Sequence, residues 1–258
     1  MKFLKIASTM NVSNNIKLVK DLHDKKNRYK ESLYLAEGSR LVLDLINHHP
    51  EDIHGLYATF AWLESNQAKV VNFLHMVVEL EERKLNSIAS LKSTKEVLAI
   101  VKMPQKLESI SYSSQNPAFY LDQVQDPGNF GTIIRTADWF GITHIFHSHH
   151  CADPFNNKAV QASMSSIARV KLMECSPTEL SSKYMFQNII GTKMNGTSIQ
   201  TFQVQDSSII CLGNEAHGIS PELSHLCQEF VSIPSSSLGS ESLNVGITAG
   251  ILMSRFYM

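Results

Sequence analysis

Three segments of the sequence combine glycine, asparagine, serine and charged residues, which are the residue types that build ligand-binding turns. They are DQVQDPGNFGTIIRTA (residues 122–137), LGNEAHGIS (residues 212–220) and IPSSSLGSESLNVG (residues 233–246). Each includes or follows an apolar stretch that predicts a strand, and backbone N–H groups in such turns approach phosphates and carboxylates. These segments are therefore the candidates for the chemical site.

The first segment predicts a tight turn that leads into a helix over residues 132–141. Pro127 and Gly128 favour the turn. Asn129 and Arg135 then lie at the N-terminus of the helix, where the helix dipole stabilises an anion. A phosphate or a carboxylate is the ligand that this arrangement favours.

Each segment by itself also has an ordinary structural interpretation, because glycine-rich turns are common. Arg135 could pair with Asp138, and Glu215 could be a surface charge. Three patterns are missing from the sequence, which argues against a nicotinamide site, a serine hydrolase and a P-loop enzyme: G-x-G-x-x-G, G-x-S-x-G and G-x-x-x-x-G-K-[ST].

A histidine-rich tract, HIFHSHHCADP (residues 144–154), is the rival candidate, as a metal site. Its possible ligands are His144, His147, His149, His150, Cys151 and Asp153. Their spacing matches neither a zinc finger nor a zincin helix. We therefore expect a loop here and no metal centre.

The second half of the chain alternates strands and helices. Strands are predicted at residues 118–124, 143–148, 169–174, 188–192, 207–213 and 230–234. Helices are predicted at residues 132–141, 157–166, 177–185, 220–228 and 243–258. This alternation predicts an α/β fold with a mostly parallel sheet and helices on both faces, where ligands bind beyond the carboxyl ends of the strands.

The first half predicts a smaller α/β unit. Its expected elements are a helix within residues 13–31, a strand at 33–37, a helix at 39–47, weak strand or loop at 55–62 and 68–74, and a strand at 95–103. Residues 106–117 are polar and flanked by proline, which predicts a linker. We expect domains over residues 1–105 and 118–258.

The composition is that of an ordinary globular protein. The chain has 258 residues, of which 43% are hydrophobic and 18% are charged, which argues against a wholly disordered or fibrous protein. Four cysteines without a C-x-x-C pair argue against a disulfide scaffold and fit a reducing compartment. No stretch predicts a signal peptide or a bilayer-spanning helix, so we expect a cytoplasmic protein with no membrane partner.

The net charge of −1 conceals a basic N-terminal region. The first forty residues hold nine Lys and Arg against four Asp and Glu. Four of the cations lie within six residues beside Tyr29, whose ring could stack on a base: Lys25, Lys26, Arg28 and Lys30. A solvated helix is the ordinary interpretation, and contact with a polyanion is the functional one.

Taken together and in this order, the three segments resemble motifs 1, 2 and 3 of the SpoU/TrmH family of SPOUT RNA ribose 2′-O-methyltransferases, over residues 118–258. Residues 16–103 more loosely resemble the N-terminal substrate-binding domain of that family, which is similar to ribosomal protein L30e. The stretch IKLVKDLHDKKNRYKESLYLAEG carries this second similarity.

The resemblance implies a trefoil-knotted C-terminal domain that binds S-adenosylmethionine in a bent pocket. A knot departs from the general rule that protein chains thread no loops. The resemblance also implies a homodimer whose active site is completed near the dimer interface. Small residues in the last helix either pack against its own sheet or form the dimer seam: Gly246, Ala249 and Gly250.

By the same resemblance, three residues correspond to positions whose backbone holds the adenosyl group: Gly213, Ile233 and Leu243. Five more correspond to the reaction centre: Asn129, Arg135, Glu215, Ser242 and Asn244. The third motif lacks the methionine that the family frequently has after its proline.

The chemistry of methyl transfer is consistent with these residue types. The 2′-hydroxyl is a very weak acid and must be held in line with the S–CH₃ bond. We expect Arg135 to grip a phosphate and stabilise the alkoxide, with Glu215 fixing its direction, and leave the proton acceptor open. Asn129 and Asn244 are expected to orient the ribose and the loops. No metal is needed, because positive sulfur already activates the leaving group.

Two classes of function remain open. One is an S-adenosylmethionine-dependent RNA 2′-O-methyltransferase, and the other is a non-catalytic RNA-binding protein that keeps the knotted fold. The intact motif residues favour the enzyme. By analogy, the N-terminal domain favours ribosomal RNA over transfer RNA as the substrate, and no DNA partner is expected.

Overall fold

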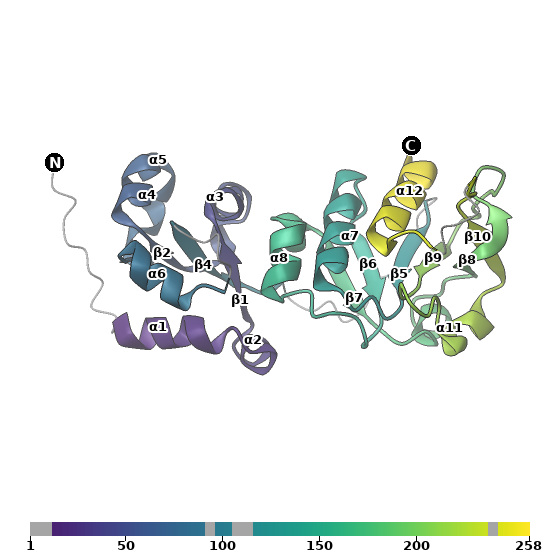
Figure 1. The fold of residues 1–258 in the computed structure, drawn as a ribbon, viewed down its shortest axis with the longest axis horizontal. Helices are drawn as coiled ribbons and strands as arrows, with labels where there is room; N and C mark the ends of the chain where they lie inside the picture. The colour runs from purple at the N-terminus through teal and green to yellow at the C-terminus, as the bar shows by residue number, and fades with distance from the viewer. Residues whose placement is uncertain (1–11, 91–95, 105–115, 237–241) are drawn as a thin grey trace. The chain divides into compact units, whose positions relative to one another are not determined.

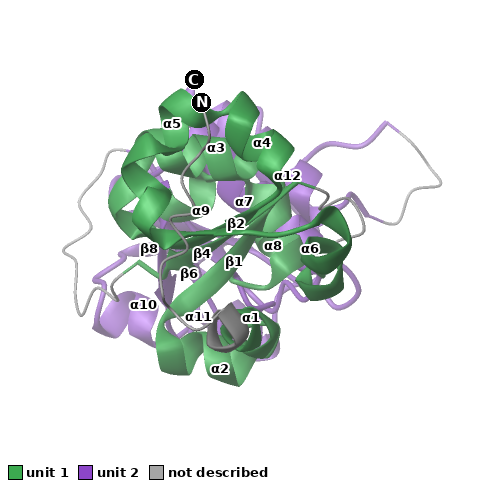
Figure 2. Cartoon of the chain, turned by 90° about the vertical axis from the view of Figure 1, so that its left-hand side faces the viewer, with its two compact units in different colours: residues 1–104, 155–168 green, residues 105–154, 169–258 purple. Residues whose placement is uncertain are grey.

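The computed structural model describes residues 12–90, 96–104, 116–236 and 242–258, and the side chains from residue 16 onward within them (Figure 1). The chain divides into two compact units (Figure 2). Unit 1 comprises residues 1–104 and 155–168, and unit 2 comprises residues 105–154 and 169–258. Most of the predicted linker lies outside the described residues, and the predicted domain boundaries stay a prediction.

Unit 2 is built on a six-stranded sheet in which every neighbouring pair of strands is parallel. The strand order is β10-β8-β9-β5-β6-β7. The strands are β5 (Ala118–Leu121), β6 (His144–His147), β7 (Lys171–Glu174), β8 (Asn188–Ser198), β9 (Ser208–Leu212) and β10 (Glu229–Ser232). β5 and β9 are buried along their whole length, as continuous apolar runs in a parallel sheet should be. The predicted parallel α/β fold is confirmed, and the knot stays a prediction.

The helices of unit 2 are α7 (Pro127–Trp139), α10 (Glu179–Ser182), α11 (Pro221–Leu226) and α12 (Val245–Tyr257). α7 and α12 pack side by side (Figure 1). This contact brings the first and third motifs together, because α7 carries most of the first and α12 begins within the third.

α7 begins five residues earlier than predicted, so the expected tight turn before residue 132 is wrong. Pro127 is at the first helical position, which suits a residue without an N–H group. The Asp126 side chain caps the helix by accepting a 2.7 Å hydrogen bond from the backbone N–H of Asn129. Asn129 therefore lies in the first turn, whereas Arg135 lies in the third turn and not at the N-terminus.

Unit 1 contains a mixed four-stranded sheet of order β1-β4-β2-β3. Its strands are β1 (Leu33–Glu37), β2 (Ile53–Ala58), β3 (Val77–Glu79) and β4 (Val97–Lys102). β4 is antiparallel to β1 and β2, and β2 is parallel to β3. Its helices are α1 (Val12–Asp21), α2 (Lys25–Glu31), α3 (Ser39–His48), η1 (Pro50–Asp52), α4 (Phe60–Ser65), α5 (Gln67–Val70), η2 (Val71–Met76), α6 (Glu82–Ile88) and α8 (Asn157–Ser163). α9 (Ser166–Arg169) ends at the boundary between the units.

Two predictions for unit 1 are wrong in detail. Residues 13–31 form two helices, because Asp24 accepts a hydrogen bond from the backbone N–H of Lys26 and starts a new helix. Residues 68–74 are helical, in α5 and η2, where weak strand or loop was expected. In the described part of the chain, no helix has the length and apolarity needed to cross a membrane.

Candidate active site

One side chain from each of the three motifs takes part in a chain of hydrogen bonds. The Asn129 side-chain amide donates to Glu215 Oε1 over 2.6 Å. The Asn244 amide donates to Asn129 Oδ1 over 3.0 Å. These residues are 86 and 115 positions apart in the sequence, so only the folded chain brings them together. Asn129 is the central member, because its amide uses both its donor and its acceptor to hold the other two motifs.

Asn244 also fixes the start of α12. Its Oδ1 accepts hydrogen bonds from the backbone N–H groups of Gly246 and Ile247, at 2.9 and 3.3 Å. This is the N-cap arrangement that satisfies free N–H groups at a helix terminus. A Cβ atom at Gly246 would lie 3.5 Å from Thr132 of α7, an ordinary van der Waals distance that reflects the close approach of the two helices. Asn244 therefore has a structural role in addition to its predicted place at the reaction centre.

The second motif forms a tight loop after β9. Asn214 and Gly218 exchange two backbone hydrogen bonds of 2.8 Å. The Asn214 side chain accepts from the backbone N–H groups of Ala216 and His217 and donates to the Gln123 carbonyl. A Cβ atom at Gly213 would lie 2.2 Å from the backbone carbon of Gly218, so only glycine fits there.

The loop is also anchored to the end of β5. The backbone N–H of Ser220 donates to Asp122 Oδ2 over 2.7 Å, and Asp122 is only 1% exposed. A buried carboxylate needs such a donor, because desolvating an unpaired charge is costly. Asp122 and Asn214 thus hold the loop in place, although neither was singled out from the sequence.

A cavity of about 910 Å³ lies in unit 2 against the second and third motifs. This volume is within the range of about 300–1,000 Å³ that is typical of small-molecule sites. Five of the eight residues predicted for the active site line it: Gly213, Glu215, Ile233, Ser242 and Leu243. Residues 237–241, in the middle of the third motif, lie outside the described residues.

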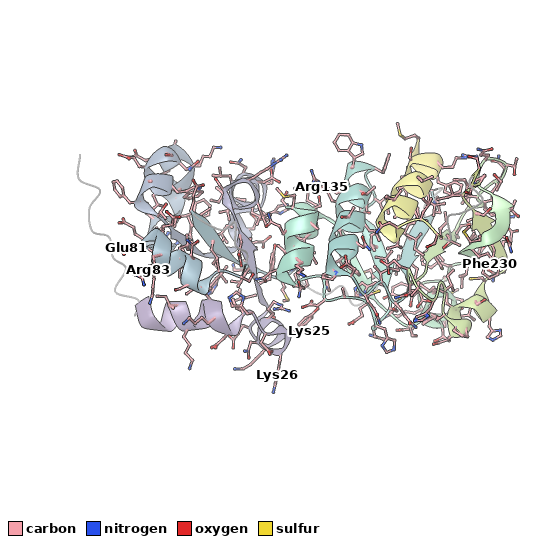
Figure 3. The ribbon with its side chains drawn as sticks, viewed as in Figure 1. Lys25, Lys26, Glu81, Arg83, Arg135 and Phe230 are labelled. Atoms are coloured by element: carbon pink, nitrogen blue, oxygen red, sulfur yellow. The ribbon has the colours of Figure 1, made fainter. Side chains whose placement is uncertain are left out.

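Arg135 is not among the residues that line this cavity. It is exposed on α7, as expected from the burial of Ile134 and Ala137 on the opposite face (Figure 3). Its expected pairing with Glu215 is wrong here, because Glu215 accepts a hydrogen bond from Asn129 instead. Within the described part of the chain, Arg135 has no hydrogen bond or ion pair. Its alternative partner, Asp138, is paired with Arg169 at 2.7 Å.

The cavity is also lined by residues that were not predicted as site residues. Thr192, Lys193 and Met194 line it from β8, and His217 lines it from the second motif. The three β8 residues lie between Gly191 and Gly196, in a segment that none of the three motifs includes. The Asn195–Gly196 pair is the turn signal that could have drawn attention to this segment.

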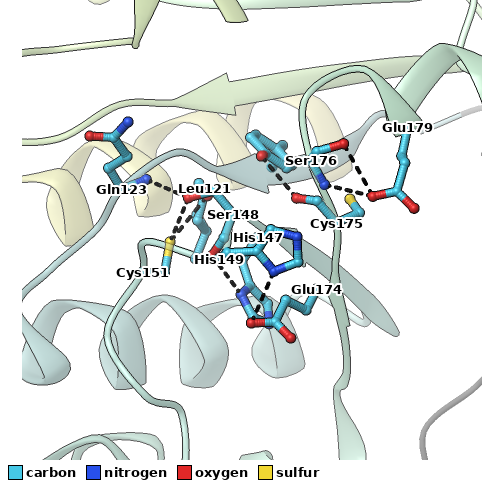
Figure 4. A network of polar contacts seen from close by, with 11 residues as sticks. Leu121, Gln123, His147, Ser148, His149, Cys151, Glu174, Cys175, Ser176 and Glu179 are labelled. Atoms are coloured by element: carbon cyan, nitrogen blue, oxygen red, sulfur yellow. Dashed lines mark hydrogen bonds and ion pairs between the residues drawn. The ribbon is translucent and has the colours of Figure 1, made fainter. Parts of the chain in front are cut away.

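The histidine-rich tract is used for local contacts at the carboxyl ends of β5, β6 and β7 (Figure 4). Cys151 Sγ donates to the Leu121 carbonyl over 3.2 Å, and His149 Nδ1 lies 3.4 Å from Glu174. In the ranges that the structure describes, only His49, Glu51 and Asp52 of unit 1 bring three possible metal ligands within 4.8 Å of one another. None of these three belongs to the tract.

All four cysteines are free. Burial raises the pKa of the Cys175 thiol to about 12. A hydrogen bond from the Cys211 side chain lowers the pKa of the Cys227 thiol, and burial raises the pKa of Cys211. The deeply buried thiols are therefore protonated at neutral pH and suited to packing.

The four candidate RNA-binding residues all lie on α2, but they are not alike. Lys25 and Lys26 are exposed on the helix (Figure 3), and Lys30 pairs with Glu31 at 3.3 Å. Arg28 is only 3% exposed, and its guanidinium donates to the carbonyls of Leu22 and His23 at the end of α1. The expectation that Arg28 presents a free charge to RNA is therefore wrong, because its charge is used to join α1 to α2.

Two family descriptions match the sequence. Residues 116–254 match the SpoU rRNA Methylase family, and residues 13–99 match the MRM3-like substrate binding domain. The 23S rRNA (guanosine(2553)-2′-O)-methyltransferase RlmP of Bacillus subtilis is 25% identical over 240 residues, which cover 91% of this chain and 92% of that protein.

Solved structures are similar over nearly the whole chain. A TrmH-family protein of Porphyromonas gingivalis is 33% identical, with a TM-score of 0.81, over 95% of this chain and 97% of the other. An AdoMet-bound rRNA methyltransferase of Sinorhizobium meliloti is 26% identical, with a TM-score of 0.77, over 95% and 94% of the two chains. AdoMet is S-adenosylmethionine, the cofactor that the sequence motifs suggested.

Proposed function

Because the chain belongs to the SpoU rRNA methylase family, we propose that it transfers a methyl group from S-adenosylmethionine to a ribose 2′-hydroxyl of ribosomal RNA. The observation that carries the proposal is the hydrogen-bonded chain Glu215–Asn129–Asn244, which joins the three motifs beside the cavity. Similarity to 2′-O-methyltransferases named for 23S rRNA supports the substrate class.

The cavity fits the proposed cofactor. Its volume suits a nucleoside-sized ligand, and its lining combines apolar and polar groups. Gly213 keeps the wall formed by the second motif free of a side chain at a point where the backbone folds back on itself. We assign Gly213, Ile233 and Leu243 to the adenosyl group. When bound, S-adenosylmethionine supplies a methyl group on a positively charged sulfur.

The protein then has to position the ribose and stabilise charge on its oxygen. Asn129 holds both Glu215, which lines the cavity, and Asn244, so it sets the orientation of these two side chains. Ser242 is exposed there and can hydrogen-bond to a ribose or phosphate oxygen. We assign Arg135 to the phosphate beside the target ribose, where its planar guanidinium makes two hydrogen bonds and stabilises the developing alkoxide.

Mapping ribose 2′-O-methylation in total RNA from cells with and without the gene tests this function. We expect one ribosomal RNA site to lose its methyl group and to regain it when the purified protein and S-adenosylmethionine are added. A change confined to transfer RNA would identify the alternative substrate. If the protein bound cofactor and RNA but left every site unchanged, it would be a non-catalytic RNA-binding protein.

A homodimer accounts for the position of Arg135. In a single chain this residue is on α7, outside the cavity lining. Large apolar side chains are exposed on α7 and α12, with Trp139 84% and Ile247 57% exposed. Exposed apolar surface of this kind is typical of protein interfaces. In our proposal, α7 and α12 form the dimer contact, and Arg135 of each protomer serves the cavity of the other.

Mixing two inactive variants tests this arrangement. Arg135→Ala and Ser242→Ala are each expected to be weakly active alone, but a mixed dimer has one cavity with an intact Ser242 and an intact Arg135 from the other protomer. With random exchange of subunits, about one quarter of all sites should recover activity. The measurement is methyl transfer after the mixture is unfolded and refolded together. Activity no higher than the average of the two variants would contradict the shared site.

Neutralising the exposed lysines of α2 should weaken RNA binding. We expect the triple variant Lys25→Ala, Lys26→Ala, Lys30→Ala to bind RNA with a weaker dependence on salt. The slope of the logarithm of the binding constant against the logarithm of the salt concentration should fall in magnitude by roughly 0.7–0.9 for each phosphate that is no longer neutralised. Arg28 is left intact because it is structural. Cofactor affinity should not change.

RNA affinity at several salt concentrations provides the measurement. Lys171→Ala with Lys183→Ala, both exposed in unit 2, is the matched control. An unchanged slope in the triple variant would remove α2 from the RNA-binding surface.

A further inference from the structure

β8 and β10 are not paired continuously, and the interruption lies at the cavity. Phe230 pairs with Gly191, but the next residue of β10, Val231, pairs with Thr197. One step along β10 thus corresponds to six along β8, which leaves residues 192–196 without partners on β10. We call these five residues the β8 bulge. Irregularities in strand pairing can re-aim side chains next to functional sites.

Both ends of the β8 bulge are held in place. At its start, Thr192 Oγ1 donates to the Cys211 carbonyl of β9 over 2.9 Å. At its end, a Cβ atom on Gly196 would lie 2.5 Å from the backbone carbon of Val231, so only glycine allows this approach. Ser232 Oγ also donates to the Gly196 carbonyl over 2.8 Å. The bulge is therefore a built feature of the sheet and not a loose loop.

The bulge places Lys193 over an aromatic ring. The Lys193 ammonium lies 3.9 Å from the centre of the Phe230 ring, a close cation–π contact. The Phe230 ring packs directly against the backbone of Gly191, where a Cβ atom would lie only 2.5 Å from the ring. Gly191 of β8 thus makes room for Phe230 of β10 (Figure 3). The Phe230 ring in turn supports Lys193 of β8. A positioned ammonium loses less freedom when it binds an anion than a freely moving one does.

The charges of the cavity complement those of the proposed cofactor. Among the described residues that line the cavity, Lys193 is the only Lys or Arg and Glu215 the only Asp or Glu. S-adenosylmethionine carries one negative group, the carboxylate of its methionine part, beside a positive sulfonium and a positive ammonium. Lys193 can therefore pair with the single negative group, and Glu215 with one of the two positive groups.

We propose that Lys193, held by the β8 bulge and Phe230, binds the methionine carboxylate of S-adenosylmethionine. The assignment rests on the proposed function, and it adds a cofactor-binding residue outside the three motifs. Lys193 should increase the affinity for the complete cofactor, because a hydrogen bond between an ammonium and a carboxylate is among the stronger hydrogen bonds in proteins.

A ligand that lacks only the carboxylate tests this contact. Calorimetric titration of the full chain with S-adenosylmethionine and with decarboxylated S-adenosylmethionine compares the two ligands. In the unaltered protein, the complete cofactor should bind more tightly. Lys193→Met should weaken binding of the complete cofactor about tenfold or more, the size expected when a charged hydrogen bond is removed. The same variant should bind the decarboxylated ligand within about twofold of the unaltered protein, which also shows that the pocket is intact.

Lys183→Met is the matched control. Lys183 also lies over an aromatic ring, that of Tyr184 at 5.2 Å, but it does not line the cavity. Its replacement should change neither affinity. Equal weakening of both ligands by Lys193→Met, or no weakening of either, overturns the proposal. Weaker RNA binding with unchanged cofactor binding assigns Lys193 to a phosphate and also overturns it. If the unaltered protein bound neither ligand, the proposed function itself would fail.

Discussion

Replacing Arg135 by alanine is expected to slow methyl transfer about a hundredfold or more, the effect of removing one donor that stabilises charge in the transition state. Folding should be unaffected, because Arg135 is exposed on α7 and has no partner among the described residues. Cofactor affinity should also change little, because Arg135 is assigned to an RNA phosphate and the adenosyl group is assigned to Gly213, Ile233 and Leu243. Arg135→Lys should restore little activity, since lysine cannot reproduce the two parallel hydrogen bonds of a guanidinium.

Single-turnover methylation, cofactor titration and a thermal melt separate these effects. Arg169→Ala is the matched control in the same unit, because its guanidinium is paired with Asp138 at the surface. Neither Arg169 nor Asp138 lines the cavity, so removing this pair should leave the rate near normal. Near-normal turnover in the Arg135→Ala variant would mean that this residue is not part of the reaction centre.

Gly213→Ala is expected to weaken cofactor binding by up to about a hundredfold. The added Cβ atom would lie within 2.2–2.4 Å of backbone atoms of Gly218 and Ile219, where no side-chain rotation can relieve the clash. The loop of the second motif must therefore move. An overpacked contact of this kind typically costs about 1–3 kcal/mol. Because this loop forms part of the cavity wall, its displacement changes the shape of the cavity.

Calorimetric titration with S-adenosylmethionine, alongside a thermal melt, measures this outcome. Gly55→Ala is the matched control, since its added Cβ atom would meet Tyr57 at an ordinary 3.5 Å. The control should bind the cofactor normally. If Gly213→Ala also bound it normally, the 212–220 loop would not form the cofactor site.

Much of the organisation of this protein follows from its sequence alone. Short apolar runs that alternate with segments of helical periodicity predicted the parallel α/β sheet. The prediction was possible because strands buried on both faces of a sheet consist almost entirely of apolar residues. The glycine-rich segments at the strand ends include the residues of the hydrogen-bonded chain and five residues of the cavity lining. Local capping was harder to interpret: Pro127 and Gly128 suggested a turn, but with Asp126 as the cap they begin a helix.

What tertiary structure alone decided is which side chains become partners. In the sequence, Arg28 is one of four neighbouring cations. In the structure it is buried where α1 meets α2, and its guanidinium donates hydrogen bonds to two backbone carbonyls. Glu215 was expected to pair with Arg135, but α7 presents Asn129 to it instead. Lys193 lies in a segment without any motif, and the register shift between β8 and β10 brings it to the cavity. The periodicity of apolar residues shows which face of a helix or strand is buried. Hydrogen-bond and ion-pair partners depend instead on which loops, far apart in the sequence, come together in the fold, and residue spacing does not encode this.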